Sequence, residues 1–324
     1  MGDRLSVVVP VHDAVQEMSV FAATVRANAS DGVRFLLVDD GSSDGTGEVL
    51  EAIAARVPHI SVSHHSSPHG AAASRNAALE RVSTRYVTFL DADDWCAPGR
   101  MASLLESIEL LGVDFVRTDH VRVIGDRRRL ERAPEGRRGV PVPAEEGIGD
   151  AGGKAMVDYP FLWAGAFDLE RIGARVMSFD PTLATASDRP FFWRLHLQSE
   201  TFAVVDAPWY YYRKDEVSGS LTNRPSESLL DFIPAYYAIL ELAETSGVAN
   251  HRRRAAYGAY RIVAFHLEKR NRLSLELQKR LVAEAKKLLL RIREADGKAA
   301  CARLDVVSRS VLDEHGALPG GRPS

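Results

Sequence analysis

Three acidic residues directly follow an apolar segment in the stretch YVTFLDADDWCAP, residues 86–98. Asp91, Asp93 and Asp94 come at the end of a run that is typical of a buried strand. Carboxylates are costly to remove from water, and neighbouring carboxylates repel one another. A divalent cation would offset this cost, because Mg²⁺ and Mn²⁺ are held by one or two carboxylates together with substrate phosphates. The stretch therefore predicts a cation site that would neutralise a departing diphosphate.

A second acidic cluster, VDDGSSDGT over residues 38–46, follows another apolar run. In open α/β sheets, ligands bind outside the carboxyl ends of the strands. Two acidic clusters at such ends are therefore expected to face one crevice. Without this placement, the DxD spacing is a weak signal, and solvated surface acids are the alternative interpretation.

The elements that would position these acids alternate along the first 120 residues. Short apolar and β-branched runs predict strands, and the segments between them predict helices of about three turns. The strands are expected over 5–11, 33–39, 59–64, 85–91 and 113–119, and the helices over 15–29, 46–56, 71–81 and 100–111. Continuous apolar strands separated by helices are typical of a doubly wound α/β domain, with a parallel sheet covered by helices on both faces.

The remainder of the chain has a different pattern. Residues 125–153 are charged and rich in glycine and proline, so we expect a long loop, either a solvated insertion or a lid. Apolar residues at helical spacing predict an α-helical C-terminal region over 226–315, followed by a disordered tail over 316–324. The first domain would then cover residues 1–225.

The composition is that of an ordinary globular protein. Of 324 residues, 45% are hydrophobic and 26% are charged, and the formal net charge of −3 does not indicate nucleic-acid binding. Two cysteines, Cys96 and Cys301, provide neither a disulfide framework nor a cysteine-rich zinc site. No stretch approaches the ~20 apolar residues of a membrane span, and the N-terminus lacks the pattern of a signal peptide. We therefore expect a reducing, cytoplasmic location.

Four stretches, SVVVPVHDA, FLLVDDGSSDGT, GAAASRNAAL and YVTFLDADDW, occur in this order. Together they resemble the nucleotide-sugar-binding half of the family 2 glycosyltransferases, whose GT-A-type fold has a mixed, mostly parallel sheet. The resemblance extends from Leu5 to about Thr222. It implies an inverting hexosyl- or N-acetylhexosaminyltransferase that moves a sugar from a nucleoside-diphosphate sugar, usually a UDP-sugar, and uses Mn²⁺ or Mg²⁺. The acceptor would be a hydroxyl of a glycan, a cell-surface polymer or a lipid-linked molecule.

The resemblance implies roles for several residues on the donor side. Pro10 would lie against the nucleobase, and His12 would stack on uracil unless it is a surface loop residue. Asp40 would accept a hydrogen bond from uracil N3–H, and Arg75 would reach the nucleotide. Asp91 would bind ribose or the metal.

The same resemblance assigns the metal itself to Asp93, with Asp94 as a supporting or lesser ligand. One departure from the family concerns the stretch HHSSPHGAAASR, where Ser66 or Ser67 stands in place of an asparagine that is common in the family. We expect Ser67 to contact the donor, with altered contacts to the base or ribose. The histidines of this stretch have no recognisable zinc spacing.

The acceptor side must supply a general base on the side of the sugar opposite the leaving diphosphate. FDPTLATASDRPFFW resembles the family stretch in which an acidic pair precedes a helix. Ser187 replaces the first acid here, so Asp188 is the expected base, with an ordinary helix N-cap as the alternative. Trp163 is expected either to stack on an acceptor sugar or to lie in the core.

The stretch WYYYRKDEVSGSLT, residues 209–222, resembles the family segment that closes over the diphosphate. Arg213 and a serine, Ser218 or Ser220, would contact phosphate oxygens, a role suited to the guanidinium group. Its glycine and serine content is typical of a loop that orders when the donor binds.

Basic residues concentrate in the predicted helical region. Residues 251–303 contain 15 Lys and Arg but 5 Asp and Glu, a net charge of +10. Such a region could attract a polymer or an anionic membrane at its inner face, whereas solvated helix faces and a subunit interface are the alternative. The apolar run at residues 288–290 must pack on the first domain or on another subunit. A homo-oligomer is therefore one of the two alternatives.

Two other classes of function stay open at this point. A phosphotransferase with a nucleophilic aspartate would normally have Thr or Val after the DxD pair, whereas Asp94 and Trp95 follow here. A scaffold that binds a nucleotide sugar without turnover would fit the missing acid at Ser187.

Overall fold

The chain packs into two units in the structure, a computed structural model that describes residues 2–214 and 226–319. The α/β unit comprises the chain up to Ala144, Phe161–Ala184 and the segment that begins at Gln198. The helical unit comprises Glu145–Pro160, Thr185–Leu197 and the C-terminal segment. Packing therefore assigns two earlier segments to the helical unit, and a domain boundary at residue 225 stays a prediction.

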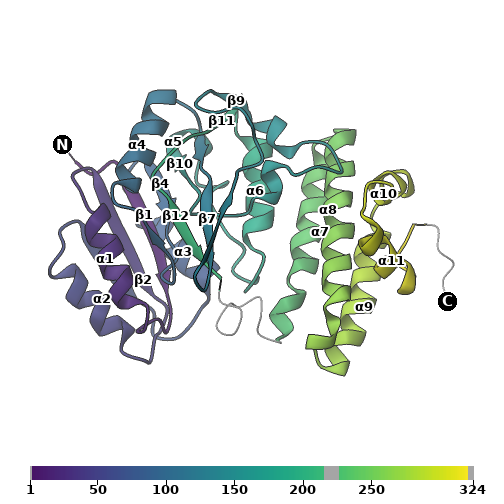
Figure 1. The fold of residues 1–324 in the computed structure, drawn as a ribbon, viewed down its shortest axis with the longest axis horizontal. Helices are drawn as coiled ribbons and strands as arrows, with labels where there is room; N and C mark the ends of the chain where they lie inside the picture. Colours follow the sequence, from purple (N-terminus) through teal and green to yellow (C-terminus); the bar gives the residue numbers. More distant parts are fainter. Residues whose placement is uncertain (1, 215–225, 320–324) are drawn as a thin grey trace. The chain divides into compact units, whose positions relative to one another are not determined.

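A mixed sheet forms the centre of the α/β unit (Figure 1). Among the described residues it has eight strands in the order β3-β2-β1-β4-β10-β6-β11-β9. The strands are β1 (Leu5–Val11), β2 (Val33–Asp39), β3 (Ile60–His64), β4 (Tyr86–Phe89), β6 (Phe115–Arg117), β9 (Val142–Pro143), β10 (Gly165–Asp168) and β11 (Thr201–Val204). β1 to β4 are mutually parallel, and β10 runs antiparallel between β4 and β6. This confirms the predicted mostly parallel sheet.

Helices cover both faces of this sheet. They are α1 (Met18–Asn28), α2 (Thr46–Ala54), α3 (Ala71–Glu80), α4 (Arg100–Leu111) and the short α5 (Leu169–Ile172). The chain moves from β1 to β2 to β3 in one direction and then crosses back to β4. Because such crossovers are right-handed, the reversal brings α3 to the face opposite α1 and α2. In open α/β sheets, ligands usually bind at the carboxyl ends of the two strands that flank such a reversal, and β1 and β4 are these strands.

A second, smaller sheet has the strand order β5-β12-β7-β8. Its strands are β5 (Trp95–Cys96), β7 (His120–Ile124), β8 (Arg127–Glu131) and β12 (Tyr210–Arg213). β7 and β8 form a hairpin whose turn uses Gly125 at a φ of 54°, a left-handed conformation that glycine adopts readily.

This hairpin corrects the prediction of a long loop over 125–153. The segment begins with β8 and continues through β9 and the 3₁₀ helix Ala144–Ile148. The strand was not recognisable because β8, with the sequence RRRLE, is an exposed edge strand without a buried apolar face.

The helical unit packs around the long helix α8 (Ala249–Glu268), which contacts four neighbouring helices. These are α7 (Phe232–Thr245), α9 (Leu275–Leu290), α10 (Glu294–Cys301) and α11 (Val306–Glu314). Small residues of α8 permit close approach: a Cβ at Gly258 would lie 3.0 Å from the Tyr236 hydroxyl. The remaining helix of this unit, α6 (Asp188–Gln198), comes earlier in the chain.

Parts of the predicted C-terminal pattern need correction. Ala317 is buried and its N–H donates to the Leu312 carbonyl, so the described part of the predicted tail is packed. Leu288 and Leu289 are buried within the helical unit, whereas Leu290 is exposed. Among the described helices, none has the length and apolar character needed to cross a membrane.

Candidate functional site

The two predicted acidic clusters lie at the carboxyl ends of strands that flank β1. β1 pairs with β2 through Val11 and Asp39 and with β4 through Val8 and Phe89. The three strands are parallel, so their carboxyl ends share one edge of the sheet. The order of the sheet therefore places both clusters beside the end of β1.

Asp39 and Asp40, at the end of β2, are fully engaged with the protein. Asp39 accepts hydrogen bonds from His64 Nδ1 at 2.8 Å and from the Ser42 N–H at 3.2 Å. Asp40 is 3% exposed and accepts from His65 Nδ1 at 2.7 Å. Its carboxylate also accepts the backbone N–H groups of residues 69 and 70 at 2.9 and 2.7 Å. Asp40 therefore organises the loop after β3.

The hydrogen-bond partners of Asp39 and Asp40 affect the pKa values of the two carboxyl groups. Burial raises the pKa of the Asp39 and Asp40 carboxyls, but the combined hydrogen bonds outweigh it and bring both pKa values below the ordinary range. The pKa of His64 is raised by hydrogen bonds to Glu51 and then to Asp39. Hydrogen bonds from the protein therefore favour the ionised form of both carboxyls.

Gly41 explains how the β2 turn fits against the loop after β3. Its φ is 66°, and a Cβ at this position would lie 2.5 Å from the Ser67 carbonyl carbon. A side chain is therefore excluded by both conformation and space. The Ser67 residue itself is exposed.

A group that sequence reasoning did not select comes together here. One ligand atom from each of Asp40, His65 and His69 lies within 4.8 Å of the others, and nitrogen and oxygen donors of this type can hold a transition metal. The histidines carry no zinc-like spacing, and the group forms because β2 pairs with β3. His12 belongs to the same neighbourhood, since its Nδ1 lies 2.9 Å from the Asp40 carbonyl oxygen. Pro10 lies just before it near the end of β1.

The acidic triplet after β4 has few compensating partners. Asp91 to Asp94 form a turn in which the Asp94 N–H donates to the Asp91 carbonyl at 3.2 Å. Asp94 is 1% exposed and accepts hydrogen bonds from the Tyr210 hydroxyl at 2.8 Å and the Arg213 N–H at 2.7 Å. Neither partner carries a formal positive charge on the donating atom.

The pKa values of these groups move in the direction opposite to those at β2. Desolvation, and then the charges of Asp93 and Asp91, raise the pKa of Asp94 well above its ordinary value. Although Asp93 itself is an exposed residue, desolvation by its surroundings, followed by the charge of Asp91, raises its pKa to about 6. The negative charge of the triplet is thus undercompensated, which is the environment that a hard cation would relieve.

Arg75 lies beside the triplet. Its Nη2 donates to Asp91 Oδ1 at 3.1 Å, and its guanidinium lies 5.9 Å from the centre of the Phe179 ring. The buried Nε of Arg75 has no hydrogen-bond partner among the described residues. A buried donor without a partner is costly, so Nε is available for an acceptor atom of a ligand.

Tyr210 and its neighbours were not identified individually as site residues. The Tyr210 hydroxyl contacts both Asp94 and the Asp91 N–H, so one buried side chain supports two members of the triplet. No sequence signal selects it, because residues 209–212 are four consecutive aromatic residues without alternation.

Trp163 requires a correction. It is 3% exposed, and its ring stacks on Tyr210 with the centroids 4.0 Å apart. His120 contacts the same indole edge-on at 4.8 Å. Trp163 is therefore a core residue in this structure and does not offer a face to an acceptor sugar.

The remaining predicted residues divide into described and undescribed ones. Asp188 is the first residue of α6, which confirms the predicted helix start, while its role as base stays a prediction. The Arg213 guanidinium lies 5.3 Å from the centre of the Trp95 ring. Ser218 and Ser220 lie outside the described residues.

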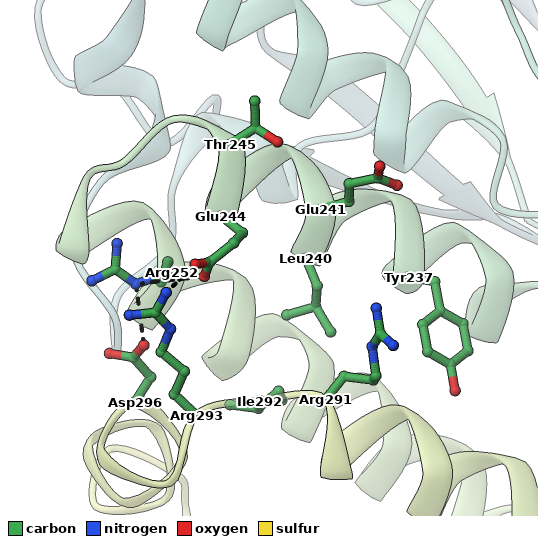
Figure 2. A pocket seen from close by; sticks show the side chains of 10 residues that line it. All are labelled: Tyr237, Leu240, Glu241, Glu244, Thr245, Arg252, Arg291, Ile292, Arg293 and Asp296. Atoms are coloured by element: carbon green, nitrogen blue, oxygen red, sulfur yellow. Dashed lines mark hydrogen bonds and ion pairs between the residues drawn. The ribbon is translucent and has the colours of Figure 1, made fainter.

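A separate cavity of about 410 Å³ belongs to the helical unit (Figure 2). It is lined by Tyr237, Leu240, Glu241, Glu244, Thr245, Arg252, Arg291, Ile292, Arg293 and Asp296. Arg252 and Arg293 both pair with Glu244, and Arg252 also lies 3.4 Å from Asp296. Most of its charges are thus neutralised within its own wall.

The chain is similar to several curated proteins. The uncharacterized glycosyltransferase EpsJ of Bacillus subtilis (strain 168) is 24% identical over 229 residues, which cover 70% of this chain and 65% of EpsJ. The minor teichoic acid biosynthesis protein GgaA of the same organism is 22% identical over 238 residues, which cover 68% of this chain and 49% of GgaA. The chain thus spans less than two thirds of the length of either relative.

Solved structures share the fold. The S. aureus TarS 1–349 structure in complex with UDP has a TM-score of 0.72 and 16% identity, and the match covers 96% of this chain and 91% of that chain. The family model described as glycosyl transferase family 2 matches residues 6–171, which is just over half of the chain and contains both acidic clusters. The chain belongs to glycosyl transferase family 2.

Proposed function

We propose that this chain is a metal-dependent, inverting glycosyltransferase that transfers a sugar from a UDP-sugar to a hydroxyl group of a glycan, cell-surface polymer or lipid-linked acceptor. The observation that carries the proposal is the undercompensated acidic triplet after β4, next to the unpartnered Nε of Arg75. A nucleoside diphosphate with a divalent cation has the charges that complement both features.

Asp91 and Asp93 would hold the cation, either Mn²⁺ or Mg²⁺. Their carboxylate oxygens are the ligand type that these cations prefer. The bound cation would neutralise the charge that develops on the departing diphosphate. Asp94 supports the turn from the buried side through its bonds to Tyr210 and Arg213.

The uridine moiety is supported by the solved TarS 1–349 structures, which contain UDP in one case and UDP-GlcNAc in another. Pro10, His12 and Ser67 would border the nucleotide, and Asp40 would use its remaining acceptor capacity toward the base. Because Asp40 already accepts three hydrogen bonds, its larger contribution would be to hold the loop at residues 65–70.

Phosphate binding would fall to arginines. Arg75 would offer its Nε to a donor oxygen while Nη2 remains on Asp91. Arg213 would offer a charged fork, a geometry that matches phosphate oxygens. Ser218 and Ser220 are proposed to assist it on the basis of the sequence alone.

Asp188 would act as the general base. In an inverting transfer, the acceptor oxygen attacks the anomeric carbon on the side opposite the diphosphate, while the base takes the proton from the acceptor hydroxyl. One C–O bond forms to the acceptor as the bond to the diphosphate oxygen breaks. Asp188 is proposed for this role because it begins a helix and stands in the family position.

The basic region over 251–303 could contact an anionic membrane, a polymer or a second copy of the chain. Many of its basic residues are already paired, for example Arg254 with Asp158 and Arg280 with Glu227. This pairing favours the interpretation that much of the charge stabilises the helical unit itself.

The experiment that tests the proposal measures UDP release by the full chain with Mn²⁺ and a panel of UDP-sugars, with and without glycan acceptors. Nucleotide binding followed by acceptor-dependent release is expected. Absence of binding to every nucleotide sugar would contradict the proposal. Binding without turnover across a wide acceptor panel would instead favour a non-catalytic scaffold, the second candidate, which the serine at position 187 keeps open.

A further inference from the structure

Two partly exposed aromatic rings lie against the buried indole of Trp163. The Phe161 ring stacks on this indole with the centroids 4.9 Å apart and an interplanar angle of 29°. The Tyr212 ring lies 5.5 Å from the same indole and 5.8 Å from Phe161. Phe161 and Tyr212 are half-buried, whereas Trp163 is 3% exposed. The accessible part of this aromatic cluster is therefore formed by Phe161 and Tyr212.

Two polar side chains point to the same side of the smaller sheet as Tyr212. Arg122 of β7 pairs directly with Tyr212 of β12, so both side chains point to one side of this sheet. Arg122 Nε lies 3.6 Å from Glu131 Oε1 of β8, which brings Glu131 to that side as well. All three residues are half-buried. We name Phe161, Tyr212, Arg122 and Glu131 the aromatic platform.

The polar members of the aromatic platform retain hydrogen-bonding capacity. Arg122 Nε is buried and has no hydrogen-bond partner among the described residues, because 3.6 Å to Glu131 exceeds the hydrogen-bond distance. A buried donor without a partner is costly, so this nitrogen is available to an acceptor atom of a ligand. A pyranose has apolar C–H faces and a rim of hydroxyl groups. Aromatic rings beside a guanidinium and a carboxylate match both parts of such a ligand.

The aromatic platform adjoins the acidic triplet through β12. The Tyr210 hydroxyl and the Arg213 N–H both donate to Asp94, and Tyr212 lies between these two residues in the strand. Tyr210 and Tyr212 point to the same side of β12, because side chains alternate along a strand. Desolvation, and then the charges of the three acids of the triplet, raise the pKa of Tyr212 to about 12. The Tyr212 side chain therefore lies close enough to the triplet to experience its charge.

The order of strands in the main sheet places the triplet between the β2 cluster and Phe161. β4 lies between β1 and β10, and Phe161 comes shortly before β10 in the chain. β10 runs antiparallel to β4, so its beginning and the end of β4 share one edge of the sheet. With the nucleoside near β1 and β2 and the diphosphate at the triplet, the aromatic platform would lie beyond the diphosphate. This is the side from which an acceptor must approach in the proposed transfer.

We propose that the aromatic platform is an acceptor subsite that binds one pyranose unit. A C–H face of the sugar would pack against Tyr212 and Phe161, while its hydroxyl groups would bond to Arg122 and Glu131. This inference rests on the proposed function, because it describes the acceptor of the same transfer. The sugar of the donor has the same chemistry, so binding of the donor must be measured separately.

The test measures, by NMR titration of the full chain, the binding of three linear tetrasaccharides made of glucose, galactose or N-acetylglucosamine. UDP and Mn²⁺ are present to occupy the proposed donor site. Wild type is expected to bind at least one tetrasaccharide. Tyr212→Leu and Arg122→Gln are each expected to bind it at least about tenfold more weakly. Absence of binding of all three tetrasaccharides to wild type would overturn the proposal.

Matched controls change the same residue types on the opposite side of this sheet. Tyr211, which is half-buried like Tyr212, stacks on Trp95 there, and the Arg128 guanidinium lies 5.7 Å from the centre of the Tyr211 ring. Tyr211→Leu and Arg128→Gln are expected to bind the tetrasaccharide within about twofold of wild type. Equal affinities of Tyr212→Leu and Tyr211→Leu would overturn the proposal.

Tyr212→Phe tests whether the ring or the hydroxyl of this residue contributes to binding. The variant retains the stacking surface, so its affinity for the tetrasaccharide is expected to stay within about threefold of wild type. Binding as weak as that of Tyr212→Leu would overturn the stacking role of the ring.

An uncharged polyglycerol with the same number of hydroxyl groups defines the ligand class. It has no flat C–H face, so it is expected to bind wild type at least about tenfold more weakly than the tetrasaccharide does. Comparable binding by polyglycerol would overturn the pyranose assignment.

Titrations with UDP, UDP-glucose and UDP-N-acetylglucosamine in the presence of Mn²⁺ separate this inference from the function on which it rests. All variants are expected to bind these nucleotides like wild type, which also shows that the variants are folded. Weaker binding of the UDP-sugars, but not of UDP, by Tyr212→Leu would assign the aromatic platform to the donor sugar and overturn the acceptor subsite. Absence of UDP binding in every protein would instead contradict the proposed function.

Discussion

The acidic residues at the ends of β2 and β4 have the same chemistry and opposite environments. Asp39 and Asp40 accept hydrogen bonds from two histidines and three backbone N–H groups, and their pKa values are lowered. Desolvation, and then the charges of the neighbouring acids, raise the pKa values of Asp93 and Asp94, although Asp94 accepts hydrogen bonds from Tyr210 and the Arg213 N–H. The protein itself supplies the hydrogen-bond donors that stabilise the carboxylates after β2, whereas the negative charge of the acids after β4 is not balanced.

This difference distinguishes a structural use of carboxylates from a ligand-binding use. A carboxylate with several N–H donors is stabilised as an anion and fixes the loops that supply them. A carboxylate among other carboxylates is stabilised by a proton or by a cation from outside. The comparison therefore favours the proposed cation site at the acidic triplet after β4, whereas Asp40 after β2 holds the neighbouring loop.

The largest expected effect comes from Asp93→Asn. The substitution keeps the size of the side chain but removes a charged ligand of the proposed cation, so kcat/KM for Mn²⁺-dependent transfer should fall by about 10³-fold or more. Steady-state kinetics at saturating acceptor would measure it. Asp126→Asn, an exposed aspartate in the β7–β8 turn, is the matched control and should retain wild-type activity. A decrease in kcat/KM of less than tenfold for Asp93→Asn would contradict the difference in role between the acids after β2 and those after β4.

Asp188→Asn should separate proton transfer from donor binding. Loss of a general base is expected to lower kcat by about 10²- to 10⁴-fold while the affinity for UDP and Mn²⁺ stays near wild type. Calorimetry with UDP and a transfer assay would measure the two quantities. The exposed Asp206→Asn serves as the control. Weakened UDP binding in Asp188→Asn would assign this residue to the donor side.

Asp40→Asn tests the complete cluster. The amide retains one acceptor oxygen in place of two, so buried N–H groups lose partners and the free energy of unfolding should fall by about 1–3 kcal/mol. Chemical denaturation would measure this change, with the exposed Asp31→Asn as the control. Unchanged stability would show that Asp40 does not organise the loop.

In metal-free protein, Asp94→Asn is expected to raise the free energy of unfolding, whereas Asp40→Asn is expected to lower it. A carboxyl whose pKa is raised on folding holds its proton while the unfolded chain releases it, so stability falls as pH rises above the ordinary value of 3.8 toward the raised pKa. Asparagine resembles the protonated carboxyl and removes this dependence. With a chelator present, wild type should lose more stability between pH 4 and pH 8 than Asp94→Asn does. An equal loss in both proteins would argue against the raised pKa.

Much of the fold was predictable because its signals are local. The apolar runs that became β1, β2 and β4 are continuous, and the glycine at position 41 marks a turn that only glycine fits. The resemblance to the family added the order of the motifs, which the family match confirms.

The remaining features depend on contacts that no local pattern encodes. β8 carries arginines on both faces, so it lacked the apolar alternation of a strand. The sequence does not show whether Trp163 is exposed or buried. Its ring is buried because it stacks on Tyr210, a residue distant in the sequence. The approach of His65 and His69 to Asp40 depends on the pairing of β2 with β3.

The most direct test of the central claim is a measurement of Mn²⁺ binding in the presence of UDP, by calorimetry, in three proteins. These are wild type, Asp93→Asn and the double variant His65→Gln/His69→Gln, which removes the nitrogen ligands of the competing group at β2. We predict that wild type and the double histidine variant bind Mn²⁺ with similar affinity, whereas Asp93→Asn binds it at least about tenfold more weakly. Loss of Mn²⁺ binding in the histidine variant, with binding retained in Asp93→Asn, would contradict the account.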